Sequence, residues 1–255
     1  ITNHVDRLEL GRGRGGAAAT AAAAGPKASG SNAFAMVFKT RYLLLMALML
    51  MLLNWVNTTG EYILGSIVKD TAAQMVAAGK SHGLDEGQLI ADFYSKYFSM
   101  VNVLGLLLQL FVVSRVVKYL GIPWAVMILP IISLSAYNIL AFYPAIYAVL
   151  AAKVAENSTD YSLNNTVRNM LFLPCTYEQK FAAKQAIDSF FVRMGDVLSA
   201  ALVFVGTTFL TLQPRGFAAV NAIIVLAWLV LAWRVGRRYG ELTQSAAVAR
   251  QSSAR

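Results

Sequence analysis

The sequence predicts an all-α integral membrane protein with six transmembrane helices. Hydrophobic residues make up 57% of the chain and charged residues only 14%, and the mean hydropathy is +0.55. A soluble domain is about half apolar and about a quarter charged. The apolar residues also form runs long enough to cross a hydrocarbon core of about 30 Å. Most basic residues stand at the ends of these runs, so the net charge of +9 indicates membrane topology rather than nucleic-acid binding.

The chain is expected to have a lead, a membrane domain and a tail. Residues 1–39 are rich in alanine and glycine and predict a largely flexible cytoplasmic linker. Because the chain opens at Ile1 without a methionine, we expect it to be a piece of a longer polypeptide. Residues 40–239 should form the membrane domain and residues 240–255 a polar cytoplasmic tail. The predicted spans are about 42–68, 93–117, 123–142, 145–173, 187–212 and 217–233.

The first predicted span, 42–68, is rich in leucine and methionine in its first half and polar in its second. Asn54, Asn57 and Glu61 are spaced by three or four residues, so they share one helix face. Glu61 is expected either to anchor the helix at the outer interface or to line a cavity. Gly60 beside it would permit a kink or a close helix approach.

The next segments are a loop and two further spans. Residues 69–92 mix both charge signs with several glycines, which predicts a loop outside the membrane, part of it a short amphipathic helix. The second span, 93–117, is followed by a basic end. The third, 123–142, contains Pro130, where we expect a kink.

The fourth predicted span, 145–173, carries a polar stripe inside an apolar helix. Its members, spaced by three or four residues, are Lys153, Asn157, Asp160, Asn164 and Arg168. A Lys, Arg or Asp at the bilayer centre costs about 2.5–3.5 kcal/mol on insertion scales, so the stripe should face protein or a water-filled cavity. The alternative is an amphipathic or bundle helix whose charges pair internally, Lys153 with Glu156 and Asn164 with Arg168.

The fifth span, 187–212, follows a polar connector and begins with charged residues. Lys184 and Asp188 are four residues apart, and Arg193 and Asp196 are three apart, which are helical pairing distances. The loops before span one and after spans two, four and six should be cytoplasmic. They hold Lys39, Arg41, Arg115, Lys118, Lys180, Lys184, Arg234, Arg237 and Arg238. The opposite side holds Lys69, Lys80, Lys96 and Arg215, so both termini are predicted in the cytoplasm.

No motif for catalysis or cofactor binding is found in the sequence. A single cysteine, Cys175, excludes an internal disulfide. Cysteine and histidine clusters with metal-ligand spacing are missing, as are Walker and GxGxxG loops. We therefore expect no enzyme, no catalytic residue, no metal and no cofactor.

A segment of about 40 residues, from Ser158 to Asp196, resembles the ATP/ADP translocase family of plastids and intracellular bacteria. The matching positions are Ser158 to Ser162, Arg168, Met170, Pro174, Lys180, Lys184 and Ala186 to Asp188. The stretch NTTGEY, with Glu61, resembles an acidic position in that family's seventh helix. RVVKYLGIPWAV resembles the loop motif of the major facilitator superfamily. Asp196 follows Gly195 where the nucleotide carriers have a basic residue.

The resemblance implies a major facilitator-type half bundle, helices seven to twelve of an antiporter in the bacterial inner membrane. Such carriers hold their solute between two six-helix halves near the midplane. The expected partners are the lipid bilayer, an N-terminal six-helix half on the same or a separate chain, and an anionic solute for which a nucleotide is one candidate. No nucleic acid is expected.

The predicted function is therefore that of the C-terminal half of an alternating-access transporter for an anionic or phosphate-bearing solute. The predicted substrate-binding residues are Asn54, Asn57, Glu61, Lys153, Asn157, Asp160, Asn164, Arg168, Lys184, Asp188 and Arg193. One alternative is a non-transporting membrane subunit or scaffold with a carrier-like fold, in which internal pairs would close the polar stripe. Another is a membrane enzyme that acts on lipid head groups.

Overall fold

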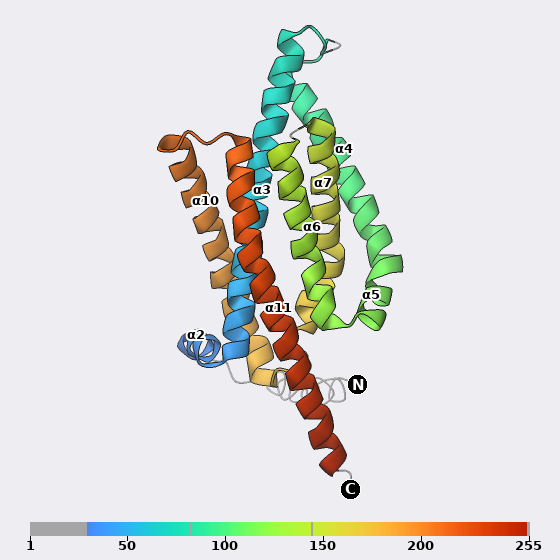
Figure 1. Cartoon of the computed structure of the whole chain (residues 1–255), viewed down its shortest axis with the longest axis vertical. Coiled ribbons are helices and arrows are strands. Elements are labelled where there is room, and N and C mark those ends of the chain that lie inside the picture. The colour runs from blue at the N-terminus through green and yellow to red at the C-terminus, as the bar shows by residue number, and fades with distance from the viewer. Residues whose placement is uncertain (1–29, 82, 144, 254–255) are drawn as a thin grey trace, which may run out of the picture.

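The computed structural model describes residues 30–81, 83–143 and 145–253, and within these ranges all regular structure is helical (Figure 1). Among the described residues, five helices are long and apolar enough to cross a membrane, which confirms an all-α membrane protein. They are Arg41–Ala77, Glu86–Tyr119, Ile122–Phe142, Gln179–Thr208 and Pro214–Val248. The predicted fourth span is helical but is not among them, since its polar stripe lowers its hydropathy. The count of six spans therefore remains a prediction.

The end of the predicted linker is the helix α2, Gly30–Lys39, while residues 1–29 lie outside the described part. Ala33 and Val37 are buried, and the Phe34 ring meets the Phe190 ring edge-on at 5.4 Å between centroids. These apolar contacts explain why residues predicted to be largely flexible form a docked helix.

The predicted loop 69–92 is largely helical, which corrects the sequence interpretation. α3 (Arg41–Ala77) extends beyond the apolar run, and α4 (Glu86–Leu107) begins before it. Gly79 and Gly83, both at positive φ, mark the true turn. The Asp85 side chain accepts from the Gln88 N–H, and the Gln88 side chain accepts from the Asp85 N–H, so a capping box starts α4.

The second predicted span continues from α4 through η1 (Leu108–Val112) into α5 (Val113–Tyr119). α6 (Ile122–Phe142) follows as the third span, with Pro130 inside it. The fourth predicted span consists of α7 (Ile146–Thr159), η2 (Asp160–Asn164) and α8 (Asn165–Met170). η2 is a π-helical turn, a feature that often marks functional sites. The 3.6-residue period on which the single-face prediction rests does not continue through it.

The fifth predicted span begins earlier than expected, because the connector is helical from Gln179 onward. It comprises η3 (Gln179–Ala183), α9 (Lys184–Ala186), η4 (Ile187–Phe191) and α10 (Val192–Thr208). α11 (Pro214–Ser253) corresponds to the sixth predicted span, and the segment predicted as a tail continues it as helix up to Ser253.

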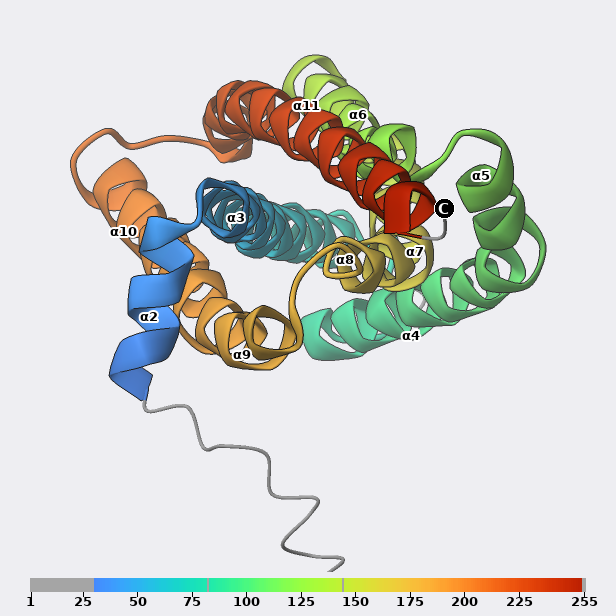
Figure 2. The ribbon, with the colours of Figure 1, turned by 90° about the horizontal axis from the view of Figure 1, so that it is seen from below.

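Helix α3 lies inside the ring of the other helices when the molecule is seen along the bundle (Figure 2). It packs against α10, α11, α4 and α7. Gly195 of α10 makes this packing close: a Cβ there would lie 2.6 Å from the Met51 carbonyl oxygen and 2.9 Å from the Trp55 nitrogen. The polar second half of α3 therefore lies against α7 and α10, which carry charged residues.

Candidate functional site

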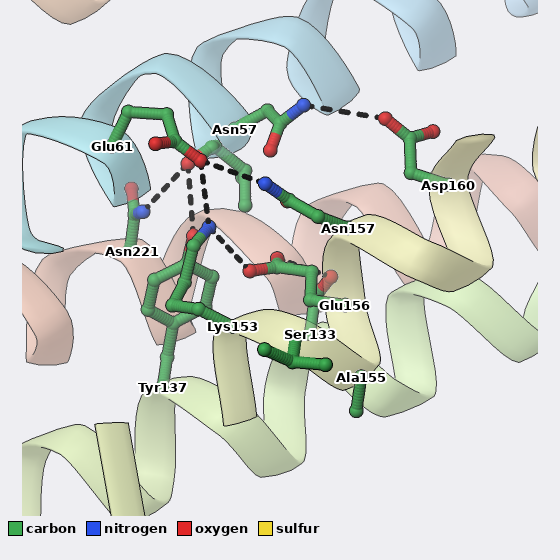
Figure 3. Close-up of polar contacts among 12 residues, drawn as sticks. Asn57, Glu61, Ser133, Tyr137, Lys153, Ala155, Glu156, Asn157, Asp160 and Asn221 are labelled. Carbon is green, nitrogen blue, oxygen red and sulfur yellow. Dashed lines mark hydrogen bonds and ion pairs between the residues drawn. The ribbon is translucent and has the colours of Figure 1, made fainter. Parts of the chain in front are cut away.

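The centre of the site is Lys153 of α7, whose side chain is fully buried (Figure 3). Its Nζ lies 2.7 Å from Oε2 of Glu156, one turn along the same helix, so the predicted pair is confirmed. It also lies 3.7 Å from Oε1 of Glu61 on α3. A buried cation thus has one close carboxylate on its own helix and a more distant one across the helix interface.

Hydrogen bonds complete the surroundings of these three charges. The Ser133 hydroxyl donates to Oε1 of Glu156 at 2.7 Å. Asn157 Nδ2 donates to Oε1 of Glu61 at 2.9 Å and to the Tyr97 hydroxyl at 2.5 Å. Such bonds stabilise buried charges that have been removed from water.

Gly60 provides the space for this cluster. A Cβ at that position would overlap the Tyr137 hydroxyl and lie 2.8 Å from Lys153 Nζ. The Tyr137 hydroxyl donates to the Val56 carbonyl at 3.0 Å, which fixes the ring against α3. Of the two roles expected for Gly60, the structure shows a close approach, which is made by the Tyr137 and Lys153 side chains rather than by a helix backbone.

Asp160 begins the π-turn η2 and has a different environment. Asn57 Nδ2 lies 3.3 Å from its Oδ2, and Asn164 Nδ2 lies 2.6 Å from its Oδ1. The predicted pairing of Asn164 with Arg168 is wrong, because the Asn164 amide binds Asp160 instead. Both contacts of Asp160 are with neutral amides.

Arg168 and Asp188 form a second cluster, between α8 and η4. Lys184, expected to pair with Asp188, instead donates to Oδ1 of Asn169 at 2.7 Å and lies over the Phe172 ring. The π-turns η3 and η4 on either side of Lys184 change the helical register there. A pairing distance derived from the α-helix consequently fails.

A third cluster joins α3 and α10 around Asp196. Its Oδ1 accepts from Asn54 Nδ2 at 2.6 Å and from the Thr58 hydroxyl at 2.7 Å, and its Oδ2 lies 3.2 Å from Arg193. The predicted pair of Arg193 and Asp196 is confirmed. The eleven predicted site residues thus do not form one cluster. They divide among these three clusters, the separate group of Asp160 with Asn57 and Asn164, and Lys184, which contacts Asn169.

A small cavity lies between the first cluster and Asp160. Its volume is ≈ 10 Å³, close to the least that holds one water. It is lined by Leu53, Val56, Asn57, Leu129, Ser133, Glu156, Asp160 and Trp228. Ion pairs occupy the space around Lys153, so this cavity does not open between Lys153 and its carboxylates. The wet interior space expected from the sequence, which a second half would complete, stays a prediction.

Sequence reasoning missed four polar residues of the first cluster. These are Tyr97, Ser133, Tyr137 and Asn221. Ser133 and Tyr137 stand four residues apart in an apolar span, and Asn221 is an isolated amide in another. Polar groups inside apolar spans rarely lack a partner, so the sequence could have identified these residues as members of the site.

The decisive comparison concerns the segment that carries most of these charges. Residues 134–239 match the family model of the TLC ATP/ADP transporters. The match confirms the predicted resemblance to ATP/ADP translocases. It includes Lys153, Asp160, Arg168, Asp188 and Asp196, all of them site residues described above. The matched family is one of transporters, not of enzymes. Neither the curated proteins nor the solved structures include a significant match to the chain.

Proposed function

We propose that this chain is the C-terminal half of an alternating-access transporter that exchanges a phosphate-bearing, nucleotide-like solute across the bacterial inner membrane. The observation that carries the proposal is the family match over residues 134–239, because it spans the buried charges of α7 and the ion pair of Arg168 with Asp188. Buried charges inside a membrane domain are costly and usually serve function.

The ion pairs that join different helices are suited to a conformational cycle. Lys153 is 3.7 Å from Glu61 on α3 but 2.7 Å from Glu156 on its own helix. A rocking movement between helices would break the longer pair first and leave Lys153 neutralised by Glu156. Arg168 and Asp188 also belong to separate helical segments. A phosphate could replace the Asp188 carboxylate, since guanidinium groups bind both anions in bidentate fashion.

An N-terminal half has a physical role in this proposal. The Glu61 and Asp188 side chains are 42% and 38% exposed, and that of Arg193 is 78% exposed. Charges in these positions would face lipid if nothing covered them. A second six-helix half would shield them and enclose the solute between the two halves.

The direct test is nucleotide exchange by the full transporter in liposomes. Arg168→Gln should reduce the exchange of external labelled ATP for internal ADP by about tenfold or more, since a hydrogen bond to a charged group is worth about 1.5–3 kcal/mol. Arg237→Gln is the control, because Arg237 pairs with Glu241 near the end of α11. Unchanged exchange by the Arg168 variant, with normal membrane insertion, would contradict the assigned role.

One observation favours a second candidate, a non-transporting membrane subunit. The Lys153 cluster is closed by internal pairs and borders a cavity no larger than about one water molecule. A wild-type protein that inserts and folds but exchanges no nucleotide would support this scaffold.

A further inference from the structure

Asp160 differs from the four acidic residues that belong to the three clusters. Those four lie within ion-pair distance of a cation: Glu61 and Glu156 of Lys153, Asp188 of Arg168, and Asp196 of Arg193. Within the part of the chain that the structure describes, Asp160 accepts only from the neutral amides of Asn57 and Asn164. Among the described residues, no cation lies within ion-pair distance of its carboxylate.

The cavity connects the Asp160 carboxyl group with Glu156 of the ion-paired cluster, so a proton could pass between them. Asp160 and Glu156 both line it, together with Asn57 and Ser133, so four polar residues surround room for about one water. Glu156 in turn contacts Lys153. A water in this cavity could carry a proton between the two carboxyl groups.

Two buried amide oxygens of the first cluster lack a hydrogen-bond partner among the described residues. They are Oδ1 of Asn157 and Oδ1 of Asn221, and the buried donor Trp55 Nε1 is unpartnered as well. Asn157 is 3% exposed and its amide nitrogen already binds Glu61. An unpaired buried acceptor costs free energy, so a proton donor that reached either amide oxygen would stabilise it.

The charged and titratable groups around Asp160 leave its charge unbalanced. Lys153 and Glu156 precede it on the same helix, and Tyr161 and Arg168 follow it. The facing helices bring Glu61 on α3, Tyr97 on α4 and Tyr137 on α6. η1, which also packs against η2, has no titratable side chain in its sequence LQLFV. Lys153 is matched by two carboxylates and Arg168 by Asp188, so neither cation is left for Asp160.

We propose that Asp160 binds and releases a proton that is coupled to solute movement. This deepens the proposed transport function and rests on it. In one state water reaches the carboxylate and a proton adds to one oxygen, which yields a neutral carboxylic acid. In the other state the O–H bond breaks and the proton passes to a water molecule, either in the cavity or on the opposite side of the membrane. The carboxylate then forms again. The neutral acid can cross the closed, dry state at a lower cost than the anion.

The first test measures protonation without any solute. Infrared difference spectra of the full transporter in liposomes, recorded on acidification, should show the carbonyl band of a protonated acid. Asp160→Asn should remove one such band, and Asp160→Glu should restore it at a shifted frequency. Asp92→Asn is the matched control, because Asp92 is half-exposed and pairs with Lys96. An unchanged set of bands in folded Asp160→Asn protein would overturn the proposal.

The second test measures coupling with labelled ATP as the probe. An imposed proton gradient should accelerate ATP exchange by the wild-type protein and by Asp92→Asn, and this acceleration should be lost in Asp160→Asn. If ATP is not exchanged at all while the infrared band still depends on Asp160, the proposed function fails and the proton site stands. If exchange proceeds without any response to the gradient, the coupling proposal fails and the transport function stands.

Discussion

Lys153 is fully buried, so its charge is stabilised by the two carboxylates beside it and by little else. Replacing it by methionine would leave Glu156 buried without a counter-charge. We expect Lys153→Met to lower the free energy of unfolding by about 3–5 kcal/mol, the usual cost of breaking a buried ion pair from one side. Steric trapping or SDS titration in mixed micelles would measure the change.

Lys96→Met is the comparison for this substitution. Lys96 and Asp92 are 64% and 50% exposed, and exposed pairs contribute about 0–1 kcal/mol. If the two lysine variants lost similar stability, the buried pair would not be the source of the effect.

Replacement by alanine should lower the stability of the protein at Gly60 of α3 but not at Gly65 of the same helix. In Gly60→Ala the new methyl group would overlap the Tyr137 hydroxyl, which is held by the Val56 carbonyl. Overpacking of this kind costs about 1–3 kcal/mol, more than the gain of about 1 kcal/mol in helix propensity. In Gly65→Ala the methyl group would lie 3.5 Å from the Tyr94 hydroxyl, an ordinary contact. The ratio of folded to unfolded protein in detergent would show the difference, and equal tolerance of both changes would refute the proposed crowding.

At the residue scale, spacing predicted contacts within a helix better than contacts between helices. Lys153 with Glu156 was predictable because both lie one turn apart on one α-helix. Arg168 with Asp188 was not predictable, since the two residues lie on separate helical segments joined by a turn. Only the packed structure shows which of several carboxylates Arg168 reaches.

At the scale of whole elements, α3 and α10 are held together by close backbone contact at Gly195. A Cβ there would lie 2.6 Å from the Met51 carbonyl oxygen, and backbone atoms cannot move aside as a side chain can. Gly195→Leu should therefore separate the helices and destabilise the fold by at least about 1–3 kcal/mol. Because Asp196 follows directly, its bonds to Asn54 and Thr58 should be lost as well.

Gly240→Leu tests whether this effect belongs to the helix contact. Gly240 lies in α11, and a Cβ added there would meet nothing within 4 Å, so the larger residue has room. Thermal unfolding followed by circular dichroism should show a clear loss for the Gly195 variant and little change for the Gly240 variant. Similar losses in both would argue against helix packing as the cause.

Helices were easier to predict from the sequence than the exact course of the backbone within them. Hydropathy located the apolar parts of α3, α4, α6, α10 and α11 because burial in lipid requires long apolar runs. It could not locate the polar ends of α3 and α4, whose helical structure depends on glycine turns and a capping box. Nor does hydropathy reveal π-turns such as η2, which shift the faces of the residues that follow.

At the scale of the whole molecule, the polar stripe decides how many times the chain crosses the membrane. In the part of the chain that the structure describes, composition alone selects five apolar helices, because the charges of α7 to α8 exclude that segment. In the structure the segment packs against α3, α4 and α6, the neighbours expected of a crossing helix. The charges are compatible with crossing because α3 and α6 supply partners such as Glu61 and Ser133.

The parity of the crossings gives a direct experimental test. With six crossings the start of α3 and the end of α11 lie on the same side of the membrane, and with five they lie on opposite sides. We expect Lys39→Cys and Ser245→Cys, each in a Cys175→Ala background, to react with a membrane-impermeant maleimide in inverted vesicles but not in intact cells. Lys80→Cys, in the turn between α3 and α4, should react in intact cells. Burial raises the pKa of the Cys175 thiol and slows its own reaction, and its removal ensures a clean background. Labelling of Lys39→Cys and Ser245→Cys from opposite sides would mean that the charged helix does not cross, and the half-bundle architecture would have to be abandoned.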